Sequence, residues 1–162
     1  MCILNCIMDK KKILKAVQAE LEEELRRQLA ANETASAGAT HGEAKAETKW
    51  DTCGLEQSYL ARGHAKQFEA LAMQVEELRG FVPSDFLGKP IGVGALVQAR
   101  MSGEPLFFFL LKCGGGVEVQ NDGAEVTVIT PESPVGAALL DKKQGEAYSF
   151  RAGMEGTIIT VE

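Results

Sequence analysis

The chain has 162 residues, of which 45% are hydrophobic and 25% are charged, and its formal net charge is −6. This length and balance suit one globular domain or two small ones, and they exclude a disordered or collagen-like chain. The acidic surplus is spread over both halves, so we expect no attraction of the whole molecule to DNA or RNA, and any nucleic-acid contact would have to be local.

The beginning of the chain and its cysteines bear on its location. The opening stretch MCILNCI is apolar but too short to span a bilayer, and no cleavable signal peptide is recognisable. The spacings of the four cysteines match neither a zinc site nor a disulfide framework, so we expect free thiols in a reducing cytoplasm. We expect Met8 to be the natural start, with residues 1–7 an extension without function.

Two segments then show the spacing of amphipathic helices. The first runs from Asp9, a candidate N-cap, to about Ala31, with apolar residues at three- and four-residue steps. The small polar stretch ANETASAGATHG follows and predicts a loop or a frayed helix end. A second apolar stripe includes Phe68, Leu71 and Leu78 and closes at Gly80. Two matched stripes around one loop predict an antiparallel coiled-coil hairpin.

From Phe81 the pattern changes to short runs rich in Val, Ile, Phe and Thr, separated by turn signals. Six such runs predict a mostly antiparallel sheet: IGVGALVQARM, PLFFFLLKC, GVEVQ, AEVTVIT, EAYSFR and GTIITVE. One interruption predicts a helix of about two to three turns, with Ser133 as cap, Pro134 in the first turn and Gly145 at the end. The fold class is therefore α+β, with an extension at 1–8, a hairpin at 9–80 and a β domain with one embedded helix at 81–162.

The turn of the hairpin carries three carboxylates, Glu43, Glu47 and Asp51, at four-residue steps. Side chains at this spacing share one face of a helix, and their mutual repulsion favours a bound cation. Mg²⁺ prefers oxygen ligands and keeps several waters, so carboxylates on a stalk can hold such an ion and orient an attacking water. Arms of about 25 to 30 residues would span about 40 Å and reach into a pore of another protein. The alternative is an ordinary solvated surface.

The segment ITPESPVGAALLDKKQGEAYSF resembles the C-terminal domain of bacterial Gre transcript-cleavage factors, whose typical version reads SPxGxALLGKxxGD between two strands. The order of hairpin and β domain is also theirs, and the resemblance extends from Met8 to Glu162. It implies an FKBP-like β domain without isomerase activity and a hairpin with an acidic tip like DLSENAEY. The tip match is partial, because the leading Asp of that motif falls on Ala44 and its Asn on Thr48.

The resemblance implies a transcription elongation factor that binds bacterial RNA polymerase at the secondary channel and is no enzyme by itself. The polymerase would cleave its own backtracked transcript, assisted by Glu43 and Glu47 as the catalytic acids. Glu43, Glu47 and Asp51 would position a Mg²⁺ ion that is shared with the polymerase active site. The resemblance implies neither a membrane nor a small-molecule substrate.

Other residues would contact the polymerase or the RNA. Ser133 and Pro134 match the SP of the family motif and are the candidates for the docking surface, although capping a helix explains them equally well. Lys45, Lys49 and Arg62 could touch the RNA near the transcript 3′ end by charge.

Two further hypotheses remain open. A regulator could bind the channel in the same way without stimulating cleavage, and the departures at Ala44 and Thr48 favour this reading. Alternatively, the chain is an interaction module unrelated to transcription, in which the hairpin is a dimerisation coiled coil.

Overall fold

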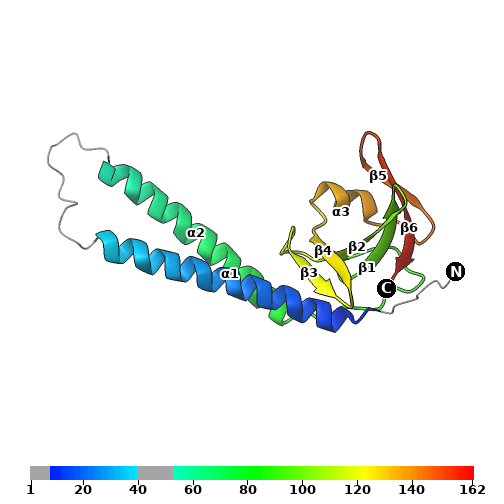
Figure 1. Ribbon diagram of the computed structural model, residues 1–162, viewed down its shortest axis with the longest axis horizontal. Coiled ribbons are helices and arrows are strands. Elements are labelled where there is room, and N and C mark those ends of the chain that lie inside the picture. The colour runs from blue at the N-terminus through cyan, green and yellow to red at the C-terminus, as the bar shows by residue number, and fades with distance from the viewer. Residues whose placement is uncertain (1–7, 40–52) are drawn as a thin grey trace. The chain divides into compact units, whose positions relative to one another are not determined.

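The computed structural model describes residues 8–39 and 53–162. Within them, Figure 1 shows two long helices, α1 (Lys10–Ala39) and α2 (Cys53–Arg79), a six-stranded sheet and the short helix α3 (Pro134–Leu139). The chain divides into two compact units, one containing the start of α1 with Gly80–Glu162 and the other Glu20–Arg79. The fold class is α+β, as predicted.

Helix α1 begins at the predicted cap and ends later than predicted. The Asp9 Oδ1 accepts hydrogen bonds from the backbone N–H groups of Lys11 at 2.9 Å and Lys12 at 3.4 Å. The helix then continues to Ala39, whereas the sequence predicted a loop or frayed end after about Ala31. The added segment needs no apolar stripe, because it is rich in alanine and the Thr34 hydroxyl donates to the Ala30 carbonyl at 2.9 Å.

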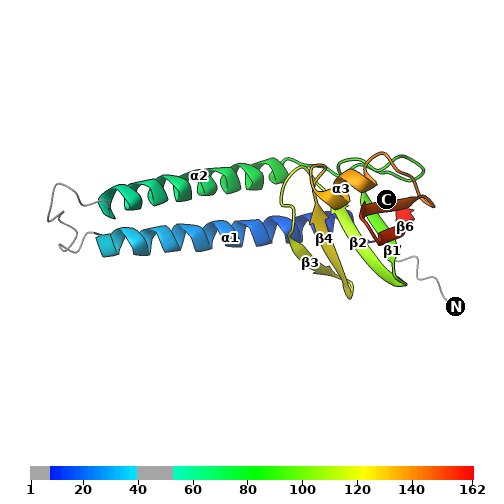
Figure 2. The same ribbon diagram turned by 90° about the horizontal axis from the view of Figure 1, so that it is seen from above.

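Within the Glu20–Arg79 unit, α1 and α2 lie side by side and run in opposite directions (Figure 2). The side chains of Leu21 and Leu71 are buried, so the predicted apolar stripes provide the contact surface of the pair. At the base, the Arg79 Nη2 lies 2.8 Å from the Glu22 Oε1 and ties the end of α2 to α1. Among the described residues, no helix has the length and apolar character needed to cross a membrane.

The sheet contains all six predicted runs, in the spatial order β3-β4-β2-β1-β6-β5. Neighbouring strands are antiparallel except for β2 and β4, where Phe107 lies beside Val126 in a parallel pair. The bounds are β1 (Leu96–Met101), β2 (Glu104–Leu110), β3 (Glu118–Asn121), β4 (Ala124–Ile129), β5 (Ala147–Arg151) and β6 (Met154–Val161).

The sheet is buried on both faces near its middle. On β2, Phe108, Phe109 and Leu110 are all buried although successive side chains of a strand point to opposite faces. One face belongs to a core cluster that also contains Leu139 of α3 and Tyr148 of β5. In the same compact unit, Ile13 and Val17 of α1 are fully buried. The first turns of α1 therefore contribute apolar side chains to the β unit.

Helix α3 begins as predicted but ends well before Gly145. Its last residue is Leu139, and the cap N–H of Leu140 bonds to the Gly136 carbonyl. The chain then turns through Asp141, whose φ is 63°. Asp141 N–H bonds to the Ile91 carbonyl at 3.0 Å and Ile91 N–H bonds to the Lys142 carbonyl at 2.8 Å. This pairing with a segment far away in sequence ends the helix early, and the predicted two to three turns are wrong.

Candidate functional site

The predicted acidic tip cannot be placed, because Glu43, Lys45, Glu47, Lys49 and Asp51 lie outside the described residues. The described residues contain no group of three or more His, Cys, Asp or Glu side chains that could hold a metal ion. The candidate features that the structure does describe are the outer part of α2, the N-terminus of α3 and a hollow beside the start of α1.

Residues 62–67, in the outer part of α2, are exposed on all sides. Every side chain from residue 62 to residue 67 is exposed, and Phe68 is the first that is partly buried. Arg62 and Lys66 are four residues apart and therefore lie on one face of the helix. Neither forms an ion pair within the described part of the chain, whereas Arg26, Arg27 and Arg79 each contact glutamates. Arg62 and Lys66 thus offer positive charge that described acids leave uncompensated.

The N-terminus of α3 has the geometry that the sequence predicted. The Ser133 Oγ accepts a hydrogen bond from the Gly136 N–H at 3.0 Å and donates one to the Thr130 carbonyl at 2.7 Å. Pro134 occupies the first turn and is exposed. Ser133 therefore has a structural role as the cap of α3, while Pro134 presents its ring to solvent. The exposed Pro134 is accessible to a partner, but its position in the fold assigns no partner to it.

Gly136 is essential to this geometry, although the sequence analysis did not single it out. A Cβ atom built on Gly136 would lie 1.8 Å from the Thr130 carbonyl oxygen and 2.9 Å from the Ser133 Oγ. Only glycine lets the first turn of α3 approach the end of β4 so closely. The glycine of the motif SPxGx, in the segment that resembles the Gre family, was the signal available in the sequence.

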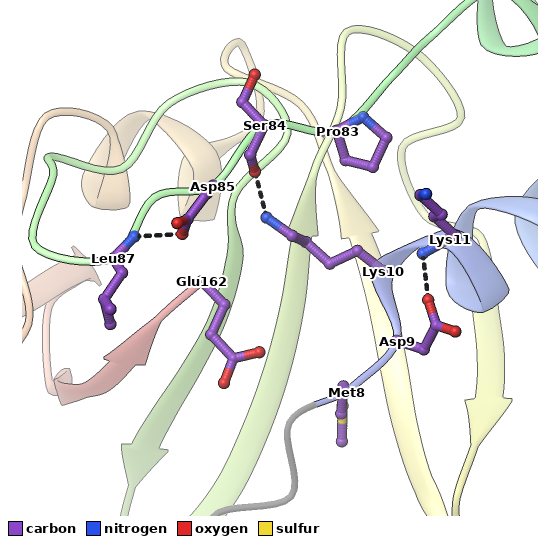
Figure 3. A pocket seen from close by; sticks show the side chains of 9 residues that line it. All are labelled: Met8, Asp9, Lys10, Lys11, Pro83, Ser84, Asp85, Leu87 and Glu162. Carbon is purple, nitrogen blue, oxygen red and sulfur yellow. Dashed lines mark hydrogen bonds between the residues drawn. The ribbon is translucent and has the colours of Figure 1, made fainter.

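A hollow of about 760 Å³ lies in the β unit, between the start of α1, the segment after α2 and the end of β6 (Figure 3). Met8, Pro83 and Leu87 give it apolar walls. Five charged residues also line it: Asp9, Lys10, Lys11, Asp85 and Glu162. No sequence pattern indicates this site, because its residues are far apart in the chain and no spacing rule connects them.

Lys10 fastens the start of α1 to the segment that leads into the sheet. Its ammonium donates to the carbonyl oxygen of Ser84 and, at 3.4 Å, to that of Gly94. The Nζ atom also lies 5.5 Å from the centre of the Phe86 ring. Burial lowers the pKa of Lys10, and the nearby carboxylates of Asp85 and Glu162 oppose this shift. The ammonium is thus held mainly by backbone carbonyls.

The carboxylate of Glu162 is less well satisfied. It accepts no hydrogen bond from any residue that the structure describes, while the Asp85 Oδ1 accepts one from the Leu87 N–H at 2.9 Å. Burial raises the pKa of Glu162; the charge of Lys10 opposes the rise and that of Asp85 adds to it. The Glu162 side chain is therefore an acceptor without a donor among the described residues, at the edge of a hollow with apolar walls.

Solved structures similar to this chain include those of Gre-like factors. No protein-family model matches the chain, and no curated protein matches it. A structure of the transcription factor Gfh1 is 22% identical, over 91% of this chain and 94% of that chain, with a TM-score of 0.38. GreA factor homolog 1 (Gfh1) of Thermus thermophilus is 18% identical over 91% of this chain and 96% of its own, with a TM-score of 0.38.

Gfh1 of Thermus aquaticus is likewise 18% identical, over 91% of this chain and 95% of its own, again with a TM-score of 0.38. These structures belong to the kind of factor that the sequence resembles.

Proposed function

We propose that the chain is a Gre-like transcription factor that binds bacterial RNA polymerase and delivers the turn of its hairpin to the polymerase active site through the secondary channel. The observation that supports this best is the outer part of α2, where no side chain from residue 62 to residue 67 is buried. A helix of 27 residues spans about 40 Å. Residues 62–67 therefore lengthen the hairpin without contributing a side chain to the core.

The charges along the hairpin fit this role. Neither Arg62 nor Lys66 has an acidic partner within the described residues. Both cations would therefore be available to RNA phosphates near the transcript 3′ end. Beyond them, the turn carries Glu43, Glu47 and Asp51. On this proposal, the cations would precede the carboxylates along the path to the polymerase active site.

The donor set of the turn suits magnesium, because it consists of carboxylates and includes no thiolate or imidazole in the predicted group. Glu47 and Glu43 would hold the ion, with Asp51 as a further ligand. When bound, Mg²⁺ would supply the charge that favours ionisation of a water molecule in the polymerase's own cleavage reaction. The role of this chain is to position carboxylates, and we propose that it performs no reaction by itself.

A second candidate function is a regulator that occupies the channel without stimulating cleavage. Ala44 and Thr48 favour it, because they replace an acid and an asparagine of the family tip motif. The third hypothesis, a dimerisation coiled coil, has less support. Leu21 and Leu71 are already buried within a single chain, so the stripes that would join two copies are occupied.

A cleavage assay on backtracked polymerase complexes tests the proposal. The wild-type chain should bind the polymerase and accelerate cleavage, and Glu47→Ala should keep the affinity within about twofold while cleavage falls by about 100-fold or more. Glu43→Ala should behave in the same way, and Asp51→Ala should have a milder effect. Failure to bind the polymerase would refute the proposal, while binding without cleavage at any Mg²⁺ concentration would establish the channel-binding regulator instead.

A further inference from the structure

Two large apolar side chains beside the hollow of Figure 3 face the solvent. Leu87, which lines the hollow, is 74% exposed, and Val82, next to the lining residue Pro83, is 76% exposed. Both belong to the segment between α2 and β1. Single exposed apolar residues are common, but here they adjoin a concave surface that already has apolar walls. Such a combination is typical of a site that receives a side chain from another molecule.

The polar groups of the hollow limit what kind of side chain can enter. The Lys10 ammonium is directed to the carbonyl oxygens of Ser84 and Gly94, so its donors are largely used. The side-chain carboxylate of Glu162 accepts no hydrogen bond from the described residues, and the second carboxylate, that of Asp85, lies close enough to interact with it. The Glu162 side-chain carboxylate therefore lacks a hydrogen-bond donor among the described residues, and a cationic side chain would supply one.

We propose that this hollow is a docking site for a protein segment in which an arginine adjoins an aliphatic residue. The aliphatic side chain would contact Met8, Pro83 and Leu87, and the guanidinium would bind Glu162 and Asp85. Arginine suits the site better than lysine, because its planar fork can donate two parallel hydrogen bonds to a carboxylate while its methylene stem covers apolar surface. The proposal is independent of polymerase binding and of the acidic turn.

The charge of the surroundings favours such a partner over an acidic one. Asp9, Asp85 and Glu162 line the hollow together with Lys10 and Lys11. Lys10 is engaged, and Asp9 is occupied in capping α1. Glu162 is left as the charged group that gains most from a new partner, because its carboxylate accepts no hydrogen bond from the described residues. Burial and the charge of Asp85 also oppose its ionisation, and the charge of Lys10 offsets them only in part.

An NMR titration of the isotope-labelled full chain tests the proposal. The probe is a blocked pentapeptide containing one arginine followed by two leucines, and the control peptide has glutamate in place of arginine. The arginine peptide should shift the amide signals of Leu87 and Glu162, and the glutamate peptide should not. Leu87→Ser and Glu162→Gln should each weaken binding by about tenfold, which corresponds to one good contact.

Two matched variants serve as controls. Met73→Ser removes an apolar side chain that is 73% exposed but lies on α2, and Glu155→Gln neutralises an exposed acid elsewhere on β6. Neither should change the affinity. Absence of binding at millimolar peptide, or equal binding of the glutamate peptide, would overturn the proposal.

Other occupants of the hollow give different results. Concentration-dependent self-association that Leu87→Ser abolishes would identify a second copy of the chain as the occupant. Binding that appears only after residues 1–7 are removed would identify the chain's own N-terminal segment. Either result would refute docking of a separate arginine-bearing segment on the full chain.

Discussion

At the scale of single residues, Gly136 connects the sequence motif to the fold most directly. Replacing it by alanine would bring a Cβ to 1.8 Å from the backbone oxygen of Thr130, which no side-chain rotation can relieve. We expect Gly136→Ala to lower the free energy of unfolding by about 3 kcal/mol or more, because the backbone of α3 must move away from β4. Urea denaturation followed by circular dichroism measures this loss.

Gly63→Ala provides the matched control. Gly63 lies in the exposed outer part of α2, and a Cβ built on it meets nothing within 4 Å. Alanine should therefore stabilise the helix by about 0.5 to 1 kcal/mol, since glycine is the poorer helix former. If both variants were destabilised to the same extent, the close contact at Gly136 would not be the cause of the loss.

Glu162 should make stability depend on pH. Its pKa is raised above the ordinary value of 4.5 because burial disfavours the charged form. The folded state thus binds this proton more tightly than the unfolded chain, and stability is lost as the pH rises through the raised pKa. Glu162→Gln should abolish that loss, so its stability advantage should be absent below about pH 4 and grow toward pH 7. Thermal melts of the wild type, of Glu162→Gln and of the control Glu155→Gln across this pH range measure the effect. If Glu162 has no part in the pH dependence, the melting temperature of Glu162→Gln will differ from that of the wild type by the same amount at every pH.

At the scale of elements, the cap of α3 allows structure and docking to be separated. Ser133→Ala removes the hydrogen bond to Gly136 and should cost about 1 kcal/mol, whereas Ser133→Asn retains a capping side chain and should cost less. If the N-terminus of α3 docks on the polymerase, the combination of Ser133→Asn with Pro134→Ala should weaken binding by about tenfold at nearly unchanged stability. Equilibrium binding to purified polymerase measures this, and unchanged affinity in a folded variant would remove the docking assignment.

The elements that the sequence predicted well are those whose signals are local. Asp9 caps α1 through N–H groups two and three residues away, and Ser133 caps α3 through Gly136 in the same way. The six strands follow from short β-branched and aromatic runs. The end of α3 could not be predicted, because backbone hydrogen bonds between Ile91 and the chain after Leu140 set where the helix ends. These bonds join segments far apart in sequence and form only in the folded β unit.

The candidate sites also differ in whether a local sequence signal marks them. Ser133 and Pro134 lie at the start of α3, as predicted, while their role in docking stays a prediction. The hollow was missed, because Lys10, Asp85 and Glu162 are brought together only by tertiary structure. The acidic turn stays a prediction, since Glu43, Glu47 and Asp51 lie outside the described residues.

At the scale of the whole molecule, reach should matter for activity independently of affinity. The outer parts of both helices contain ranges without a fully buried side chain, namely 26–32 in α1 and 62–68 in α2, although Phe68 is partly buried. Deleting both ranges removes one heptad from each arm, which preserves the phase of the apolar stripes and shortens the hairpin by about 10 Å. Because Leu21, Leu71 and Val75 remain, the shortened chain should fold and retain helical circular dichroism.

The shortened chain should bind polymerase with nearly the affinity of the full chain but lose transcript cleavage by about 100-fold or more, because carboxylates held 10 Å away cannot share an ion with the active site. The deletion also removes Arg62 and Lys66, so the control is the full-length chain with both replaced by glutamine, which isolates the contribution of charge. Cleavage assays on the same stalled complexes compare the three proteins. If the shortened chain stimulated cleavage as well as the full chain, the length of the hairpin would not matter for activity. Glu43 and Glu47 would then be interpreted as ordinary solvated surface residues.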